Sequence, residues 1–206
     1  MSAPADALPS GVPGLPALLE PATARLRLRQ WCDADRAPFA ALNADPEVMR
    51  CFPAPLARAD SDAMAERCQG LIAAHGWGPW AVERREDGAF VGLVGLHVPA
   101  AALPCAPCVE VAWRLARAHW GRGYASEAAA AALRAGFEVL GLASIVSFTV
   151  LANQRSRRVM ERIGMRDCGA DFDHPAVAEG SPLRRHCLYR ITRGEWLAHQ
   201  AAVPQA

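Results

Sequence analysis

The sequence has no apolar run that approaches the roughly 18 residues needed to span a bilayer, and neither sign of charge is in excess. Its 22 lysine and arginine residues face 21 aspartate and glutamate residues, for a net charge of +1. This balance argues against a general binder of nucleic acid or of acidic membranes. The first 22 residues also lack the basic start and apolar centre of a secretory signal, so we expect a cytoplasmic protein.

The seven cysteines are an odd number and follow no export signal, which favours reduced thiols over a disulfide framework. Cys105 and Cys108 have the CxxC spacing, but a second CxxC is missing. A structural zinc ion would therefore need distant ligands such as Cys168, His174 or Cys187. A redox pair is a second alternative. We favour a proline-bearing turn before a strand, and we expect no metal site.

The chain length of 206 residues favours a single domain, because cores of this size seldom divide. Five prolines among residues 1–22 oppose a helix there. We therefore predict a flexible N-terminal arm over 1–22, one domain over 23–197 and a short C-terminal tail over 198–206.

Apolar periodicity predicts an α/β domain with a sheet of about six or seven strands. An alternating RLRLR segment opens it, and Asp-Gly at 87–88 marks a tight hairpin turn. The predicted strands cover 25–29, 80–84, 90–98, 108–115, 144–150, 165–172 and 185–192, and the predicted helices cover 33–43, a turn from 46, 61–74, 124–140 and 153–163.

A glycine-rich turn joins the strand at 108–115 to the helix that follows, within 119-HWGRGYASEAAAAAL-133. The first turn of a helix leaves backbone N–H groups unpaired, and the helix dipole favours an anion there. Gly121 and Gly123 keep that backbone unobstructed, and Arg122 adds a positive charge. The turn therefore predicts a phosphate-binding cradle.

Other interpretations of this turn stay open at this point. A dinucleotide fingerprint needs a third glycine where Ser126 stands, and a Walker loop needs a Gly-Lys-Ser/Thr that is missing. An ordinary tight turn between a strand and a helix would also contain glycines.

Two longer segments carry a resemblance to a known family. The runs 110-EVAWRLARAHWGRGYASEA-128 and 147-SFTVLANQRSRRVMERIGM-165 resemble the two acetyl-CoA motifs of the GNAT family of N-acetyltransferases. They are most similar to the branch with the ribosomal-protein N-terminal (alanine/serine) acetyltransferases, and 172-FDHP-175 and 186-HCLYRITRGEW-196 extend the likeness. The resemblance implies the GNAT fold: a mixed, mostly antiparallel sheet with flanking helices and a splayed parallel pair at the cofactor site.

The resemblance also implies an acetyl-CoA site. The strand backbone before the cradle would pair with the pantetheine arm as a neighbouring strand would. Trp120 departs from the Gln or Arg that the family pattern has at that slot. Asn153 is an N-cap by its position, and its arginine-rich surroundings are a candidate for the 3′-phosphate or simply a solvated basic face. The implied cofactor-binding residues are Trp113, Arg114, Leu115, Gly121, Arg122, Gly123, Tyr124, Ala125, Ser126, Asn153, Ser156 and Arg157.

Three residues are candidates for the chemistry. Glu110 is the candidate base, although a salt bridge with Arg114 would equally explain it. Met160 stands where many family members have a proton-donating tyrosine, so Ser156 or water would replace it, or no acid is needed. His174 is a candidate to relay a proton or to bind an acceptor carboxylate, and a turn role is the alternative.

We therefore expect an acetyl-CoA-dependent N-acetyltransferase that acts on a primary amine by direct attack, without an acyl-enzyme. The acceptor is a protein or peptide N-terminus or a small-molecule amine, and a homodimer is compatible with the sequence. A non-catalytic acyl-CoA-binding or sensing domain and a nucleotide-binding module are the alternatives.

Overall fold

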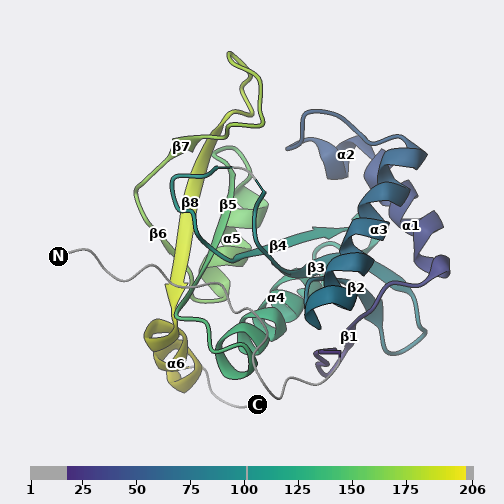
Figure 1. The fold of residues 1–206 in the computed structure, drawn as a ribbon, viewed down its shortest axis with the longest axis horizontal. Coiled ribbons are helices and arrows are strands. Elements are labelled where there is room, and N and C mark those ends of the chain that lie inside the picture. Colours follow the sequence, from purple (N-terminus) through teal and green to yellow (C-terminus); the bar gives the residue numbers. More distant parts are fainter. Residues whose placement is uncertain (1–17, 101, 203–206) are drawn as a thin grey trace.

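The computed structural model of the chain describes residues 18–100 and 102–202 (Figure 1). Most of the predicted arm, residues 1–17, lies outside the described residues, as do 203–206 of the predicted tail. Residues 18–22 contact the domain, since the Leu19 amide donates to Gly76 O at 2.7 Å and Trp80 Nε1 donates to Leu19 O at 2.8 Å.

A sheet of eight strands organises the molecule, in the order β1-β2-β3-β4-β5-β8-β6 with β7 also paired to β8. Every neighbouring pair is antiparallel except β4 and β5, which confirms the predicted mixed sheet (Figure 1). The predicted strand over 165–172 is two short strands, β6 and β7. The strands are β1 (Leu26–Arg29), β2 (Pro79–Arg84), β3 (Phe90–His97), β4 (Glu110–Leu115), β5 (Ser144–Val150), β6 (Arg166–Asp167), β7 (Phe172–Asp173) and β8 (Arg185–Thr192).

The helices follow the predicted order, with a short 3-10 turn added after β4 and one helix added at the C-terminal end. That addition, α6, starts with a capping box in which the Glu195 amide donates to Thr192 Oγ1 and the Thr192 amide donates to Glu195. No helix of the described segments is long and apolar enough to cross a membrane. The helices are η1 (Asp33–Asp35), α1 (Arg36–Ala44), α2 (Pro46–Met49), α3 (Arg58–His75), η2 (Arg117–His119), α4 (Tyr124–Arg134), the π-helical turn η3 (Ala135–Val139), α5 (Gln154–Arg162) and α6 (Arg193–Ala202).

The two faces of the sheet have different covers, as the separate groups of helices in Figure 1 show. Side chains alternate along β4, so Val111 and Leu115 lie on one face and Glu110 and Arg114 on the other. The α4–η3 segment packs on the first face, where a Cβ on Gly136 would meet Ile145 and Leu96. Arg114 on the second face reaches α1 and α3.

A smaller apolar cluster lies beside the main core, between β5, β8 and the loop before β4. Its buried residues are Leu103, Val146, Phe172 and Leu188. Cys105 and Cys108 pack against it as free thiols with their Sγ atoms 3.5 Å apart. No group of three or more metal-ligating side chains occurs within the described part of the chain.

The contact of β3 with the start of β2 gives a stability prediction. A methyl group on Gly95 would collide with the Gly78 carbonyl and the Pro79 Cα, which are backbone atoms that cannot rotate away. We expect Gly95→Ala to destabilise the protein by about 2–4 kcal/mol in urea unfolding. In α3, Gly70 has open space around it, so Gly70→Ala is expected to stabilise by about 0.5–1 kcal/mol. Equal unfolding midpoints for the two variants would contradict this packing.

Candidate functional site

The parallel strands β4 and β5 touch at one end only. Glu110 and Val146 form their single registered pair, in which the Val146 amide donates to Val109 O at 2.9 Å. Beyond that point β4 stays paired with β3, and β5 stays paired with β8. The two neighbours therefore separate into a wedge that opens toward their carboxyl ends.

Backbone polar groups of β4 line this wedge. The carbonyls of Val109 and Leu115 both point away from β3, because the first accepts from β5 and the second accepts from Trp120 Nε1 at 2.8 Å. Strand alternation gives the peptide groups of Val111 and Trp113 the same direction. An exposed strand edge of this kind can hydrogen-bond to the amides of an extended ligand.

The glycine turn follows at the open end of the wedge. Gly121 and Gly123 have φ values of 73° and 79°, in the left-handed region that glycine adopts without strain, and Gly123 is the N-cap of α4. The first backbone bond of the helix runs from the Glu127 amide to Gly123 O at 3.0 Å. The preceding amides of the first turn therefore point out of the helix beside three exposed residues, 121–123.

The only carboxylate in this first turn, on Glu127, is neutralised within the protein. Thr23 Oγ1 donates to Glu127 Oε1 at 2.5 Å, Arg25 Nε donates to Oε2 at 2.6 Å, and Arg25 Nη1 binds Arg122 O at 3.0 Å. Burial favours a higher pKa for Glu127, but these hydrogen bonds prevail and lower its pKa. The helix terminus is thus left electropositive for an external anion.

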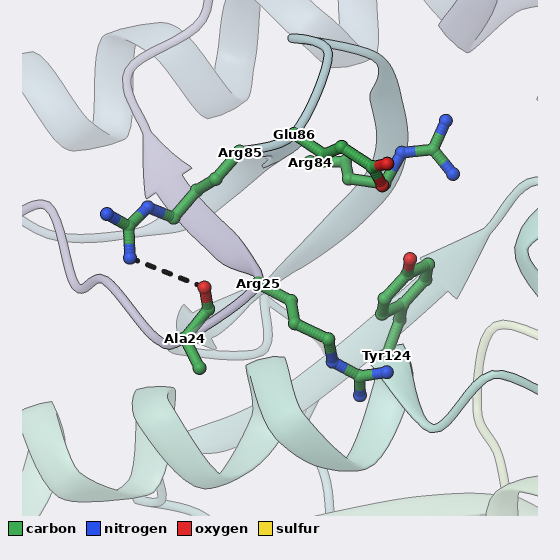
Figure 2. Close-up of a pocket in the computed structure, with 6 residues that line it drawn as sticks. All are labelled: Ala24, Arg25, Arg84, Arg85, Glu86 and Tyr124. Atoms are coloured by element: carbon green, nitrogen blue, oxygen red, sulfur yellow. Dashed lines mark hydrogen bonds between the residues drawn. The ribbon is translucent and has the colours of Figure 1, made fainter.

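A pocket on the β1 side of the same turn carries several arginines, and Figure 2 shows Arg25 and Arg84 near Tyr124, with Arg85 directed toward Ala24. Arg84 pairs with Asp87, and Arg85 Nη1 donates to backbone carbonyls of the β1 approach, including Ala24. Because these cations already have partners, the open glycine side offers the better anion site.

Both ends of α5 contact the glycine turn and the first turn of α4. The Arg155 Cζ lies 4.5 Å from the Trp120 ring centroid, and Arg162 Nη1 donates to Ser126 Oγ at 3.2 Å. These contacts connect the helix after β5 with the turn after β4. The wedge is therefore bridged at its mouth by residues from both sides.

Asn153 caps α5 as predicted, since its Oδ1 accepts from the Ser156 amide at 3.3 Å. Its Nδ2 donates to Thr149 Oγ1 and to Ser156 Oγ, which leaves the Ser156 hydroxyl proton available as a donor. Arg157 is directed toward Tyr189 and Asp167 instead of the cradle. Met160 is 1% exposed and packs in the core, so its side chain offers no proton donor to the site.

Glu110 lies at the closed end of the wedge, and its partner is a residue that sequence reasoning missed. His97 stands directly opposite on β3, and its Nε2 lies 3.3 Å from Glu110 Oε2. Burial raises the pKa of Glu110 well above its usual range and lowers the pKa of His97. Arg114 makes its polar contact with Asn43, so the alternative of a Glu110–Arg114 ion pair does not occur.

His174 belongs to an aromatic group on the same side of the sheet as Glu110. Its ring centroid lies 4.9 Å from that of His186 and 5.7 Å from that of Phe148. Its Nδ1 accepts from the Ala176 amide at 3.2 Å, a contact that a turn role predicts. Burial, followed by the charge of His186, lowers the pKa of His174 and favours the neutral ring.

Comparison with known proteins identifies this arrangement. A family model described as "Acetyltransferase (GNAT) domain" matches residues 25–166. The chain belongs to the GNAT acetyltransferase family. GNAT enzymes use acetyl-CoA, and the exposed amides at the glycine turn and the unpaired β4 edge suit its pyrophosphate and pantetheine groups.

Individual relatives agree with the family. The chain is 32% identical over 192 residues to the FsC-acetyl coenzyme A-N(2)-transacetylase of Aspergillus fumigatus, with 86% of this chain and 78% of that protein covered. A GNAT acetyltransferase structure from Bacillus anthracis has a TM-score of 0.72 and 24% identity over 85% of this chain and 99% of that one. The structure of RimJ of Mycobacterium smegmatis in complex with CoA-disulfide has a TM-score of 0.64 and 22% identity, over 85% of this chain and 89% of that one.

The cradle generates a prediction about cofactor affinity. A valine at Gly123 would place a branched side chain at a positive φ and beside the first-turn amides. We expect Gly123→Val to weaken acetyl-CoA binding at least about tenfold in calorimetric titration. Gly169→Val is the matched control, because Gly169 also has a positive φ but lies in open space away from the wedge. Identical affinities for the two variants would exclude the cradle as the phosphate site.

Proposed function

We propose that this GNAT acetyltransferase transfers the acetyl group of acetyl-CoA to a primary amine by direct nucleophilic attack, with Glu110 as the proton acceptor. The observation that carries the proposal is the position of Glu110. It is 6% exposed and lies where β4 and β5 still touch, at the closed end of the wedge. Its carboxyl group therefore stands where the unpaired β4 edge begins.

The wedge and the cradle are proposed to hold the co-substrate. Trp113 offers its backbone to the pantetheine arm, whereas the Arg114 peptide faces β3 and the Leu115 carbonyl is occupied by Trp120. The amides at Tyr124, Ala125 and Ser126, with Gly121, Arg122 and Gly123, would hold the pyrophosphate. Acetyl-CoA supplies a thioester carbonyl when bound. Asn153 serves as the cap of α5, and the exposed Arg155 is closer to the cradle than the engaged Arg157.

The protein's part in the reaction is proton transfer and charge stabilisation. Near neutral pH the amine is mostly protonated, so the minor free-amine form attacks, and Glu110 takes the one N–H proton that this amine loses as the C–N bond forms. A backbone N–H at the β4 edge can donate to the oxyanion. The C–S bond then breaks and releases a thiolate. An ordinary thiol has a pKa of about 8.5, so the thiolate can leave without a general acid. If a general acid does protonate it, the Ser156 hydroxyl is the candidate donor.

We propose that the acceptor is a primary amine, without choosing between a protein N-terminus and a small molecule. The Aspergillus relative is named for N(2)-transacetylation, whereas the RimJ likeness at 22% identity concerns the fold. A protein or peptide N-terminus and a small-molecule amine both meet the chemical demand. The proposal is tested by incubating the protein and acetyl-CoA with a panel of amines and of peptides that have free N-termini, and by measuring the release of free CoA. Stabilisation by acetyl-CoA without acetylation of any amine would favour the non-catalytic alternative, which the buried Met160 supports.

Replacement of the base gives a pH-dependent effect. Glu110 accepts a proton only when ionised, so with its raised pKa the wild-type kcat/KM is expected to rise with pH. We expect Glu110→Gln to lower kcat/KM about 10²–10⁴-fold at pH 7 and much less at high pH, where free amine is plentiful. Glu138→Gln removes an exposed glutamate and serves as the control. An equal loss at both pH values would remove Glu110 as base.

The neighbouring histidine should set the position of that pH profile. His97 Nε2 lies 3.3 Å from Glu110 Oε2, where a ring N–H can donate a hydrogen bond to the ionised carboxylate. We expect His97→Leu to move the rise of kcat/KM to higher pH by roughly one unit, because the carboxylate loses this partner. The exposed His75 offers the control His75→Leu. A His97→Leu profile that superimposes on the wild-type profile would show that His97 has no influence on the base.

A further inference from the structure

The side chain of Arg114 is held by two fully buried polar residues. Arg114 Nη1 donates to Asn43 Oδ1 at 2.6 Å, and Asn43 Nδ2 donates to Ser61 Oγ at 2.9 Å. Asn43 and Ser61 are both 0% exposed. Because a guanidinium can only donate, the Asn43 atom that faces Arg114 is the amide oxygen. Two buried polar groups are thus used to position one cation.

The other neighbours of this guanidinium are weak partners. Phe52 stacks on it with its ring centroid 4.1 Å from Cζ, and Met64 Sδ lies 3.8 Å from Nη1. Burial lowers the pKa of Arg114 to about 10, against a smaller opposing effect of Cys68. A guanidinium has five N–H donors, and within the described ranges Asn43 is its only oxygen acceptor.

Arg29 is another poorly exposed arginine, and its ion-pair partners provide a comparison. Its side chain is 13% exposed and pairs with Asp35 at 2.7 Å and Glu83 at 2.6 Å. Arg114 has no carboxylate within 4.0 Å among the described residues. A buried cation without a counter-charge is costly, and an anion brought by a ligand would offset that cost.

Arg114 lies on the acceptor side of the proposed reaction. Strand alternation puts it on the same face of β4 as Glu110, with only the small Ala112 between them. The two Cα atoms are four residues apart, or about 13 Å at about 3.3 Å per residue. Phe52, which covers the guanidinium, is itself 37% exposed, so this end of the face borders solvent. A small molecule over Ala112 could face both the base and the cation.

We infer that Arg114 binds a carboxylate of the acetyl acceptor, so that the preferred acceptor is an amine that carries a carboxylate, such as a free amino acid or a short peptide. The inference rests on the proposed N-acetyltransferase function. Arg114 contributes a planar pair of donors that suits a carboxylate, and Asn43 keeps that pair oriented.

Matched acceptors test this assignment. Each of several L-amino acids is compared with its C-terminal amide, which keeps the amine and the side chain but lacks the negative charge. Because amine basicity differs within a pair, the measured quantity is the acid-to-amide ratio of kcat/KM in each protein. We expect Arg114→Met to lower this ratio about tenfold or more relative to wild type. Arg134→Met removes an exposed arginine of α4 and should keep the wild-type ratio.

A binding experiment separates this inference from the proposed function. N-acetyl-L-methionine and N-acetyl-L-methioninamide are titrated calorimetrically into wild type and Arg114→Met in the presence of CoA. Tighter binding of the acid by wild type alone supports the carboxylate site, even if no amine in the panel is acetylated. An unchanged acid-to-amide ratio in Arg114→Met, or equal binding of both compounds by wild type, overturns it. Unaltered CoA affinity of Arg114→Met shows that the variant is folded.

Discussion

The parting of β4 from β5 after a single registered pair is the constraint on which the rest of the site depends. It leaves the peptide group of Trp113 without a neighbouring strand. Buried polar groups without partners cost about 1–3 kcal/mol each, so the wedge favours a ligand that brings its own amides. The same divergence places the starts of α4 and α5 side by side, because each helix follows one of the two strands. Trp120 and Arg155 then join the two sides.

One strand can serve two substrates because its backbone and its side chains point in perpendicular directions. The peptide groups of β4 lie in the plane of the sheet, and every second one faces the wedge while the others bond to β3. Glu110 and Arg114 project from the sheet toward His97 and Asn43. The co-substrate and the acceptor can therefore approach the same six residues without competing for the same atoms.

Much of this architecture could be predicted from local sequence signals, whereas its long-range pairings could not. The glycine turn, the Asn153 cap and the order of strands follow from short-range chemistry, and the family resemblance added the splayed pair. The contact of His97 with Glu110 was missed because the loop between their strands does not fix the register. The partner of Arg157 depends on where β8 lies, which no local pattern indicates. The α6 helix did have a signal, since Thr192 and Glu195 have capping-box spacing.

The hydrogen bonds of Glu127 to Thr23 and Arg25 join residues more than 100 positions apart in the sequence. In synthesis Thr23 and Arg25 are made first and Glu127 follows about 100 residues later, so these contacts form only when the chain folds back on itself. The proposed anion site at the turn is complete only when the first strand has docked and Arg25 has paired with Glu127. Coenzyme affinity in this protein is accordingly a property of the completed tertiary structure, and a partly folded chain would gain little from the presence of acetyl-CoA.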